Sequence, residues 1–237
     1  TSNVATVTIN VNPANSFTLL ENTAAGTLVG QLQLTDPDID GSIIFQLEDD
    51  QLDPLLRIAP DDHFSGSPTS SVVLIEYLDF QCPACRSYHP VINGLEDTFA
   101  GELLVIRRHL PLTQVHGNAF SAAVAAEAAG RQGKFEEMGD LLFDNQSEWA
   151  NASDPQVFYV QYANELSLDT TQFVSDLGDT ALTDRVQRDA DAAATLGATG
   201  TPTFYLEGDF IADIPSSAHE FANLIQSEID AVDDVFR

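Results

Sequence analysis

Residues 72–85 read VVLIEYLDFQCPAC, and no other stretch of the chain limits its possible fold as much. The first part is apolar on both sides of an extended chain, which is typical of a central strand covered by helices on both faces. Only Glu76 interrupts this run. Pro83 suits the first position of a helix, where its missing N–H would have no intrahelical partner. Cys82 is therefore expected at a helix N-terminus, directly after a buried strand.

The chain beyond this helix predicts an α/β core with a helical insertion. Strand-like residues return at 102–110 and at 203–208, and the long alanine-rich stretch between them contains several helical patterns. Because that stretch is too long for one crossover, we expect a helical subdomain inserted at about residues 113–198. A last helix at 217–236 repeats apolar residues along one face, which should dock on the sheet.

The residues before this core show a different pattern, of short alternating strands separated by turn residues. Residues 21–47 (ENTAAGTLVGQLQLTDPDIDGSIIFQL) resemble bacterial cadherin-like repeats, although the second half of a full repeat is missing. Residues 61–71 have the Gly, Ser and Pro composition of a linker. We therefore predict a partial cadherin-like β-module at 1–62, a linker at 63–71 and a second domain at 72–237.

An acidic turn within the β-module raises the question of calcium. Asp36, Asp38, Asp40 and Gly41 reproduce the opening of an EF-hand-type loop, in which carboxylates at alternate positions bind the ion. The twelfth position of such a loop supplies a bidentate Glu, and Leu47 stands there instead. Two interpretations therefore stay open, a weak calcium site and a solvated acidic turn.

The charge of the chain argues against one class of partner. With 9 Lys and Arg against 37 Asp and Glu, the formal charge of −28 repels phosphate backbones, so we expect no nucleic acid partner. No apolar run approaches the ~18 to 20 residues needed to span a bilayer. The chain opens with Thr1 rather than Met, from which we expect either a mature exported chain or an excised piece of a longer one.

The order of the motifs resembles a known family. A strand, C-x-x-C at a helix start, a helical insertion and then GTPTFYL (200–206) look like the thioredoxin fold, and specifically its DsbA-like branch. HGNAFSAAVAAEAAGRQGKFEEMGDLLF (116–143) is similar to the first inserted helices of DsbA-like proteins. Glu76 matches a buried carboxylate of thioredoxin relatives, and Thr201-Pro202 resembles their cis-proline pair. The resemblance covers about residues 68–237 and implies an α/β thioredoxin fold with a helical insertion.

The two cysteines, the only ones in the chain, admit other interpretations. The same spacing serves zinc, but zinc needs further Cys or His ligands at a comparable pair, and none is evident. A structural disulfide would close too small a loop to restrict an unfolded chain much. A redox couple is therefore favoured. His89, His109 and His116 are expected to be structural or surface residues, because no second shell of ligands is apparent.

The helix position and the resemblance together imply roles for the site residues. A helix N-terminus lowers the pKa of Cys82, which would make it the attacking sulfur, and Cys85 would resolve the mixed disulfide. Glu76 would accept and return the Cys85 proton, unless its carboxylate escapes to water. A cis Pro202 would leave the Thr201 backbone free to pair with an extended substrate. The expected substrate-contact residues are Phe80, Pro83, Ala84, Thr201 and Pro202.

The predicted function is that of an exported thiol-disulfide oxidoreductase, most simply an oxidase of protein thiols, with no cofactor beyond the Cys82-Cys85 pair. Its partners would be thiol- or disulfide-containing proteins and a redox partner that reoxidises or reduces the pair. A reductase or isomerase, a binding or display protein, and a relative altered for small-molecule chemistry are the alternatives. Strong oxidases of this family resemble C-P-H-C, and Ala84 cannot stabilise a thiolate as that histidine can, so an intermediate reduction potential is expected.

Overall fold

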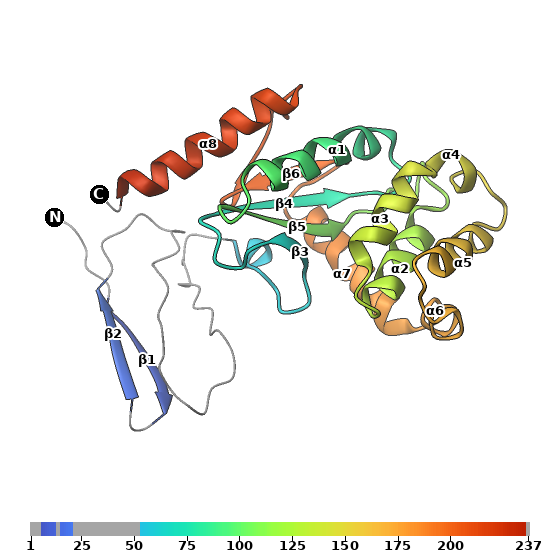
Figure 1. The fold of residues 1–237 in the computed structure, drawn as a ribbon, viewed down its shortest axis with the longest axis horizontal. Coiled ribbons are helices and arrows are strands. Elements are labelled where there is room, and N and C mark those ends of the chain that lie inside the picture. Colours follow the sequence, from blue (N-terminus) through green and yellow to red (C-terminus); the bar gives the residue numbers. More distant parts are fainter. Residues whose placement is uncertain (1–5, 13–14, 21–52, 236–237) are drawn as a thin grey trace.

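The computed structural model of the chain describes residues 6–12, 15–20 and 53–235. The strands β1 (Thr6–Asn12) and β2 (Asn15–Leu20) form an antiparallel hairpin, drawn in blue in Figure 1. This hairpin falls in the part of the chain for which we predict a β-module, whose cadherin-like character stays a prediction. The calcium candidates Asp36, Asp38 and Asp40 lie outside the described residues.

A mixed five-stranded sheet, in the order β3-β5-β4-β6-β7, forms the centre of residues 53–235. Its strands are β3 (His63–Gly66), β4 (Val72–Leu78), β5 (Leu103–His109), β6 (Thr203–Leu206) and β7 (Asp209–Phe210). The pair β4 and β5 is parallel, and the other neighbouring pairs are antiparallel. The strand expected at 72–78 is thus the middle strand, which explains why it is apolar on both sides.

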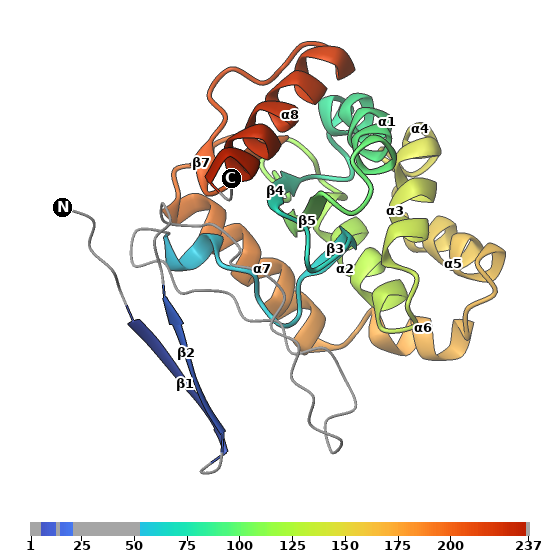
Figure 2. The same cartoon turned by 60° about the vertical axis from the view of Figure 1, so that its left-hand side comes forward.

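Helices cover both faces of the sheet. Their bounds are η1 (Pro54–Leu56), α1 (Pro83–Thr98), α2 (Ala119–Gly130), α3 (Phe135–Asp144), α4 (Gln146–Trp149), α5 (Gln156–Glu165), α6 (Thr170–Asp176), α7 (Thr180–Thr195) and α8 (Ala218–Val235). Figure 2 shows α1 and α8 on one side of the sheet and α7 on the other. Within the described residues, no helix is both long and apolar enough to cross a bilayer.

The alternation of side chains along β4 divides the core between these two faces. Leu74 packs with Ile92 of α1 and Phe221 of α8, whereas Ile75 packs with Ala193 of α7 and with the neighbouring strands. Successive residues of a strand point to opposite faces, so one short strand contributes to both clusters. Glu76 is consequently placed on the same face as Leu74, beneath α1.

The predicted helical insertion is present as α2 to α7, between β5 and β6. Helix α2 is buried on nearly all sides because its many alanines let neighbouring helices approach closely. Large side chains fill the space around it, among them Trp149, Tyr159 and Phe173. This cluster also contains Phe80, Cys82 and Cys85, so the insertion packs directly against the cysteine motif.

The expected linker at 63–71 requires a correction. Residues 63–66 form β3, which pairs with β5 from His63 opposite Arg107 to Gly66 opposite Leu104. The sequence HFSG carries a weak strand signal, and the strand exists because the edge of β5 supplies hydrogen-bond partners. The preceding residues belong to the same unit, since Leu56 of η1 is buried in the core. The second domain therefore begins before residue 63.

Candidate active site

The two cysteines lie at the start of α1 and are both free thiols. Cys82 is the N-cap residue, with φ −73° and ψ 123°, and Pro83 follows it at the first helical position. The Cys82 side chain is buried to 7% exposure, and Cys85 has no exposed surface. The expected helix start at Pro83 is confirmed, and it places one sulfur at the rim of the site and the other beneath it.

The electrostatic environment stabilises Cys82 as a thiolate. A hydrogen bond from the Cys85 thiol makes the largest contribution and lowers the pKa of Cys82 to about 5, against the opposing effect of burial. The Thr201 side chain and the backbone N–H groups of Ala84 and Cys85 add to this lowering. These N–H groups are the unsatisfied donors of the first helical turn, and they reach the sulfur because Cys82 is the N-cap residue.

Cys85 has the opposite character. Burial raises the pKa of Cys85 well above its usual value, and the hydrogen bond to Cys82 and the charge of Glu76 raise it further. The Asp79 backbone N–H donates to the Cys85 sulfur at 3.5 Å. Two sulfurs one helical turn apart therefore differ strongly in acidity, because one faces the helix N-terminus and the other is enclosed by apolar side chains.

Glu76 lies beneath the motif and is only 2% exposed, so its carboxylate does not escape to water. Burial raises the pKa of Glu76 to about 7, although the charges of Arg107 and His89 act to lower it. A carboxyl group with a pKa near neutrality can both donate and accept a proton. The structure thus gives Glu76 the acidity that the expected proton exchange with Cys85 requires.

The Thr201-Pro202 peptide bond is cis. The Cys82 thiol donates to the Thr201 carbonyl oxygen at 3.4 Å, which brings the segment before β6 to the Cys82 sulfur although the two residues are far apart in sequence. Pro83 and Ala84 are exposed beside Cys82, whereas Pro202 is buried and Thr201 is partly buried. Three of the five expected substrate-contact residues, Pro83, Ala84 and Thr201, therefore lie next to Cys82.

Phe80, the fifth expected substrate-contact residue, requires a correction because its side chain is 2% exposed. Its ring packs against Phe143 at a centroid distance of 5.1 Å and against His109 at 6.2 Å. An aromatic ring directly before a catalytic turn is as useful for anchoring that turn as for binding a substrate. In this chain Phe80 anchors the turn on the helical insertion.

Two buried amide side chains, those of Gln146 and Gln81, join the turn that carries the cysteines to the helical insertion, and the sequence analysis did not single them out. Gln146 donates to the Phe80 and Cys82 main-chain carbonyl oxygens, and the side-chain Oε1 of Gln81 accepts from the Asn118 backbone N–H at 2.7 Å. These contacts join segments that are distant in sequence, so no local sequence pattern predicts them. A polar residue at the start of an otherwise apolar helical cluster was the only available signal.

Arg107 was also missed, although two adjacent arginines in a strand are a visible signal. Its buried guanidinium lies 2.6 Å from Glu96 and 3.0 Å from Glu136, and it also donates to Ser65 and Asn93. A buried cation is tolerated when several acceptors surround it. Arg107 therefore holds a positive charge close to Glu76 inside the fold.

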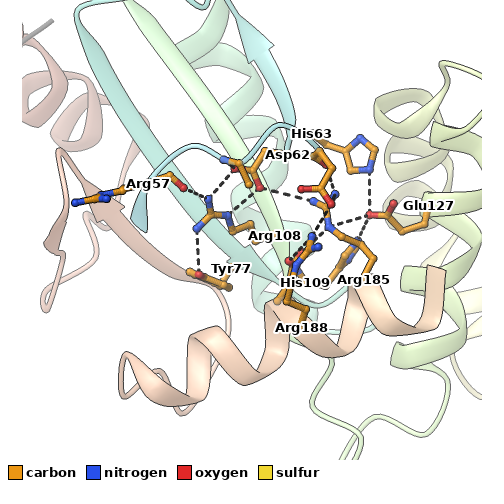
Figure 3. Close-up of polar contacts among 12 residues, drawn as sticks. Arg57, Asp62, His63, Tyr77, Arg108, His109, Glu127, Arg185 and Arg188 are labelled. Atoms are coloured by element: carbon orange, nitrogen blue, oxygen red, sulfur yellow. Dashed lines mark hydrogen bonds and ion pairs between the residues drawn. The ribbon is translucent and has the colours of Figure 1, made fainter. Parts of the chain in front are cut away.

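A second buried polar cluster ties the segment before β3 to the core, as Figure 3 shows. Arg108 contacts both carboxylate oxygens of Asp62, at 3.0 and 2.7 Å. Glu127 of α2 accepts from the Nε2 atoms of His63 and His109, at 3.0 and 2.8 Å. Arg185 of α7 lies between these groups. The buried charges in mutual contact show that Asp62 and His63 are integral to this domain.

The three histidines of the sequence analysis each contact a carboxylate. His89 lies 2.6 Å from Asp140, His109 contacts Glu127, and His116 lies 2.7 Å from Asp79. In the part of the chain that the structure describes, no group of three or more His, Cys, Asp or Glu residues is arranged to hold a metal ion. These contacts agree with the structural role expected for the histidines.

Comparison with known proteins gives one family. A family model described as thioredoxin matches residues 59–227. Among curated proteins, the chain is 39% identical over 158 residues to Na(+)/H(+) antiporter NhaA 3 of Salinispora tropica and 40% identical over 158 residues to NhaA 1 of Salinispora arenicola. Each match covers 66% of this chain but only 23% of the relative, so the chain spans less than a quarter of the length of either protein.

Solved structures give the same fold. Alpha-DsbA1 of Wolbachia pipientis has a TM-score of 0.67 at 23% identity, over 77% of this chain and 98% of that one. A thioredoxin-like oxidoreductase from Silicibacter pomeroyi has a TM-score of 0.60 at 25% identity, over 74% and 94%. BdbD of Bacillus subtilis has a TM-score of 0.63 at 18% identity, over 70% and 92%. The thioredoxin fold with a helical insertion is therefore confirmed.

Proposed function

Because the chain belongs to the thioredoxin family, as the match over residues 59–227 shows, we propose that it is a thiol-disulfide oxidoreductase that works through Cys82 and Cys85. One observation carries this proposal. The pKa of Cys82 is lowered to about 5 at the N-terminus of α1, while the pKa of buried Cys85 is raised well above its usual value. This asymmetry separates a sulfur that attacks and leaves from one that keeps its proton.

The proposed oxidation of a substrate begins from the disulfide form of the pair. A substrate thiolate attacks the Cys82 sulfur, and the bond between Cys82 and Cys85 breaks with its electron pair on Cys85. Glu76 then protonates Cys85. A second substrate thiolate attacks the substrate sulfur of the mixed disulfide, and Cys82 leaves as a thiolate. The substrate thereby loses two electrons and gains a disulfide, and the cysteine pair gains the two electrons.

The acidity of Cys82 supports net oxidation of substrates. A sulfur of low pKa is a good leaving group, and a stabilised thiolate favours the reduced form of the protein, which raises its reduction potential. The side chain of Ala84 adds no charge or hydrogen bond to that stabilisation, to which only its backbone N–H contributes. We therefore place the potential between the ≈ −120 mV of a strong periplasmic oxidase and the ≈ −270 mV of thioredoxin. A redox partner must then reoxidise the pair after each turnover.

The proposed substrates are proteins with free thiols in an exported compartment, where disulfides persist. An extended substrate segment would lie beside Cys82, pair with the Thr201 backbone and pass over the exposed Pro83 and Ala84. Recognition of main chain rather than of particular side chains suits an enzyme that acts on many sequences. The strongly acidic composition favours substrates that are not themselves highly acidic.

Two measurements test this function and its direction. The first is the equilibrium of the Cys82-Cys85 couple with glutathione, which yields the reduction potential. The second is the refolding rate of a reduced protein that needs disulfides, with the oxidised wild type and with Cys82→Ser. We expect acceleration by the wild type alone. A potential near that of thioredoxin, with efficient insulin reduction and no oxidative refolding, would make the protein a reductase instead.

A further inference from the structure

One side chain of the helical insertion reaches the main chain of the catalytic turn. Gln146, at the start of α4, is 4% exposed. Its Nε2 atom donates to the Phe80 carbonyl oxygen at 2.7 Å and to the Cys82 carbonyl oxygen at 3.1 Å. Figures 1 and 2 both place α4 beside α1. A single amide group therefore spans the carbonyl groups on either side of Gln81.

These carbonyl groups determine where the Cys82 sulfur points. The Cys82 carbonyl oxygen also accepts the first hydrogen bond of α1, from the Arg86 backbone N–H at 3.1 Å. The Cys82 backbone N–H donates to the Asp79 carbonyl oxygen at 3.0 Å. Gln146 adds a third restraint from outside the helix, so the N-cap conformation, with ψ of 123°, is held on both sides. In that conformation the free N–H groups of the first turn face the sulfur.

The segment that carries Gln146 is itself fixed to the same turn. Trp149 of α4 is fully buried, and its indole N–H donates to the Leu142 carbonyl oxygen at 2.8 Å. The Gln81 side chain donates to the Ala150 carbonyl oxygen at 2.7 Å. The Asn118 side-chain amide donates to the carbonyl oxygens of Trp149, Ala150 and Ala152, at 3.1, 3.2 and 3.0 Å. Residues 146–152 therefore cannot drift away from the cysteine motif without breaking several buried hydrogen bonds.

We propose that Gln146 is a positioning residue of the redox site, which holds the main chain of Phe80 and Cys82 so that the N-terminus of α1 stays aimed at the Cys82 sulfur. The inference rests on the proposed function, because it assigns to the helical insertion control over the stability of the Cys82 thiolate. Without the Gln146 amide, the N-cap dihedral angles relax and the donors of the first turn no longer converge on the sulfur. The Cys82 thiolate is then less stable, and the reduced form of the protein is destabilised relative to the disulfide form.

The test compares two substitutions of the same kind. Gln146→Met keeps the length and the burial of the side chain but removes the two hydrogen bonds. Gln132→Met removes two similar bonds to the main chain of Asp169, elsewhere in the insertion. The measurement is the rate of iodoacetamide alkylation of Cys82 against pH, together with the equilibrium with glutathione. Thermal unfolding of each variant reports on the merely structural effect.

We expect the alkylation midpoint of Gln146→Met to rise by about half to one pH unit, since one net hydrogen bond is worth about that much. The equilibrium with glutathione should shift towards the disulfide form by about three- to tenfold. Gln132→Met should leave both quantities as in the wild type, even where it lowers the melting temperature equally. An unchanged midpoint in folded Gln146→Met overturns the inference.

The outcomes separate this inference from the proposed function. A wild-type midpoint near that of free cysteine defeats the proposed function itself, whereas a low wild-type midpoint that Gln146→Met does not move defeats only the positioning role. If the methionine variant does not fold, Gln146→Asn replaces it, because this amide is one methylene too short to reach both carbonyl oxygens. A folded asparagine variant with the wild-type midpoint overturns the inference in the same way.

Discussion

Glu76 and Arg107 lie directly opposite each other on the parallel strands β4 and β5. Arg107 is buried and forms ion pairs with Glu96 and Glu136. Its positive charge lowers the pKa of Glu76 only in part. Burial therefore prevails, and the pKa of Glu76 rises to about 7. Because the charge of Arg107 opposes the effect of burial, the pKa of Glu76 stays near neutral pH, where the carboxyl group can exchange a proton with a cysteine.

Glu76→Gln should stabilise the protein at alkaline pH and slow its chemistry. Because burial raises the pKa of Glu76 from 4.5 to about 7, its contribution to stability is present below pH 4.5 and lost as the pH rises through 7. The variant lacks this loss, so above pH 7 its free energy of unfolding should exceed that of the wild type by up to about 3 kcal/mol. Urea unfolding at pH 4 and pH 8 measures the difference.

In the reverse reaction, in which Cys85 attacks the mixed disulfide, the same variant should react more slowly, because Cys85 loses its proton acceptor. The control Glu102→Gln removes one negative charge at an exposed site and reports on net charge alone. Equal stability of Glu76→Gln and wild type at pH 8, with unchanged resolution rates, would contradict the assigned role of Glu76.

Cys82 should be alkylated by iodoacetamide with a midpoint near pH 5, because hydrogen bonding from Cys85 lowers its pKa from 9.0 to about 5. A lowered pKa adds stability that is fully present above pH 9 and is lost as the pH falls through 5. The stability of the reduced wild type relative to Cys82→Ser should therefore decrease between these two values. Chemical denaturation of both proteins under reducing conditions measures this trend.

The two cysteine variants should fail in different ways. Cys82→Ser removes the attacking sulfur and should abolish turnover, whereas Cys85→Ser should accumulate mixed disulfides between Cys82 and a substrate. Non-reducing electrophoresis after incubation with a thiol-containing protein distinguishes the two. Trapping by Cys82→Ser instead would reverse the assigned roles.

Asp62→Asn should strongly destabilise the protein, because it leaves the buried Arg108 guanidinium without its paired carboxylate. Removal of one partner from a buried ion pair costs about 3–5 kcal/mol. The matched control is Asp61→Asn, since neighbouring Asp61 is exposed and its ion pairs are worth less than about 1 kcal/mol. Denaturant unfolding of both variants gives the comparison, and equal effects would count against the buried pair.

Truncation should show where the second domain begins. A chain that starts at Asp53 keeps η1, Asp62 and β3, and we expect it to fold and to retain redox activity. A chain that starts at Ser67 loses all three and should unfold at much lower temperature, because Arg108 and Arg185 are left buried without Asp62. Circular dichroism melts of the two chains decide the matter, and a stable, active shorter chain would restore a boundary at the predicted linker.

Glu127→Gln should destabilise the protein at neutral pH by about 1 to 3 kcal/mol, the cost of leaving buried partners unsatisfied. Burial alone would raise the pKa of Glu127, but hydrogen bonds from His109 and His63 outweigh it and hold the pKa well below its usual value. Its stabilisation is therefore present above pH 4.5 and lost as the pH falls further. The two unfolding curves should approach each other in acid, and a gap that widens there would contradict this account.

The sequence by itself determined those parts of the protein that depend on neighbouring residues. The apolar run of 72–78 predicted the central strand, and Pro83 after Cys82 predicted the helix start, because strand burial and helix capping leave their signal within a few residues. The helical insertion followed from the length and composition between two strands. The cadherin-like character of the β-module predicted at 1–62, and the binding of calcium by Asp36, Asp38 and Asp40, stay predictions.

Only the tertiary structure decided which distant groups meet. Residues 63–66 form β3 because they pair with the edge of β5. The Phe80 side chain is buried because it packs in the apolar cluster of the helical insertion. Gln146 contacts Cys82 because α3 and α4 fold back over α1. The burial of Arg107 and the pairing of Arg108 with Asp62 likewise depend on segments far apart in the chain. Hydrogen bonds and ion pairs between such segments have no periodicity, so no sequence pattern records them.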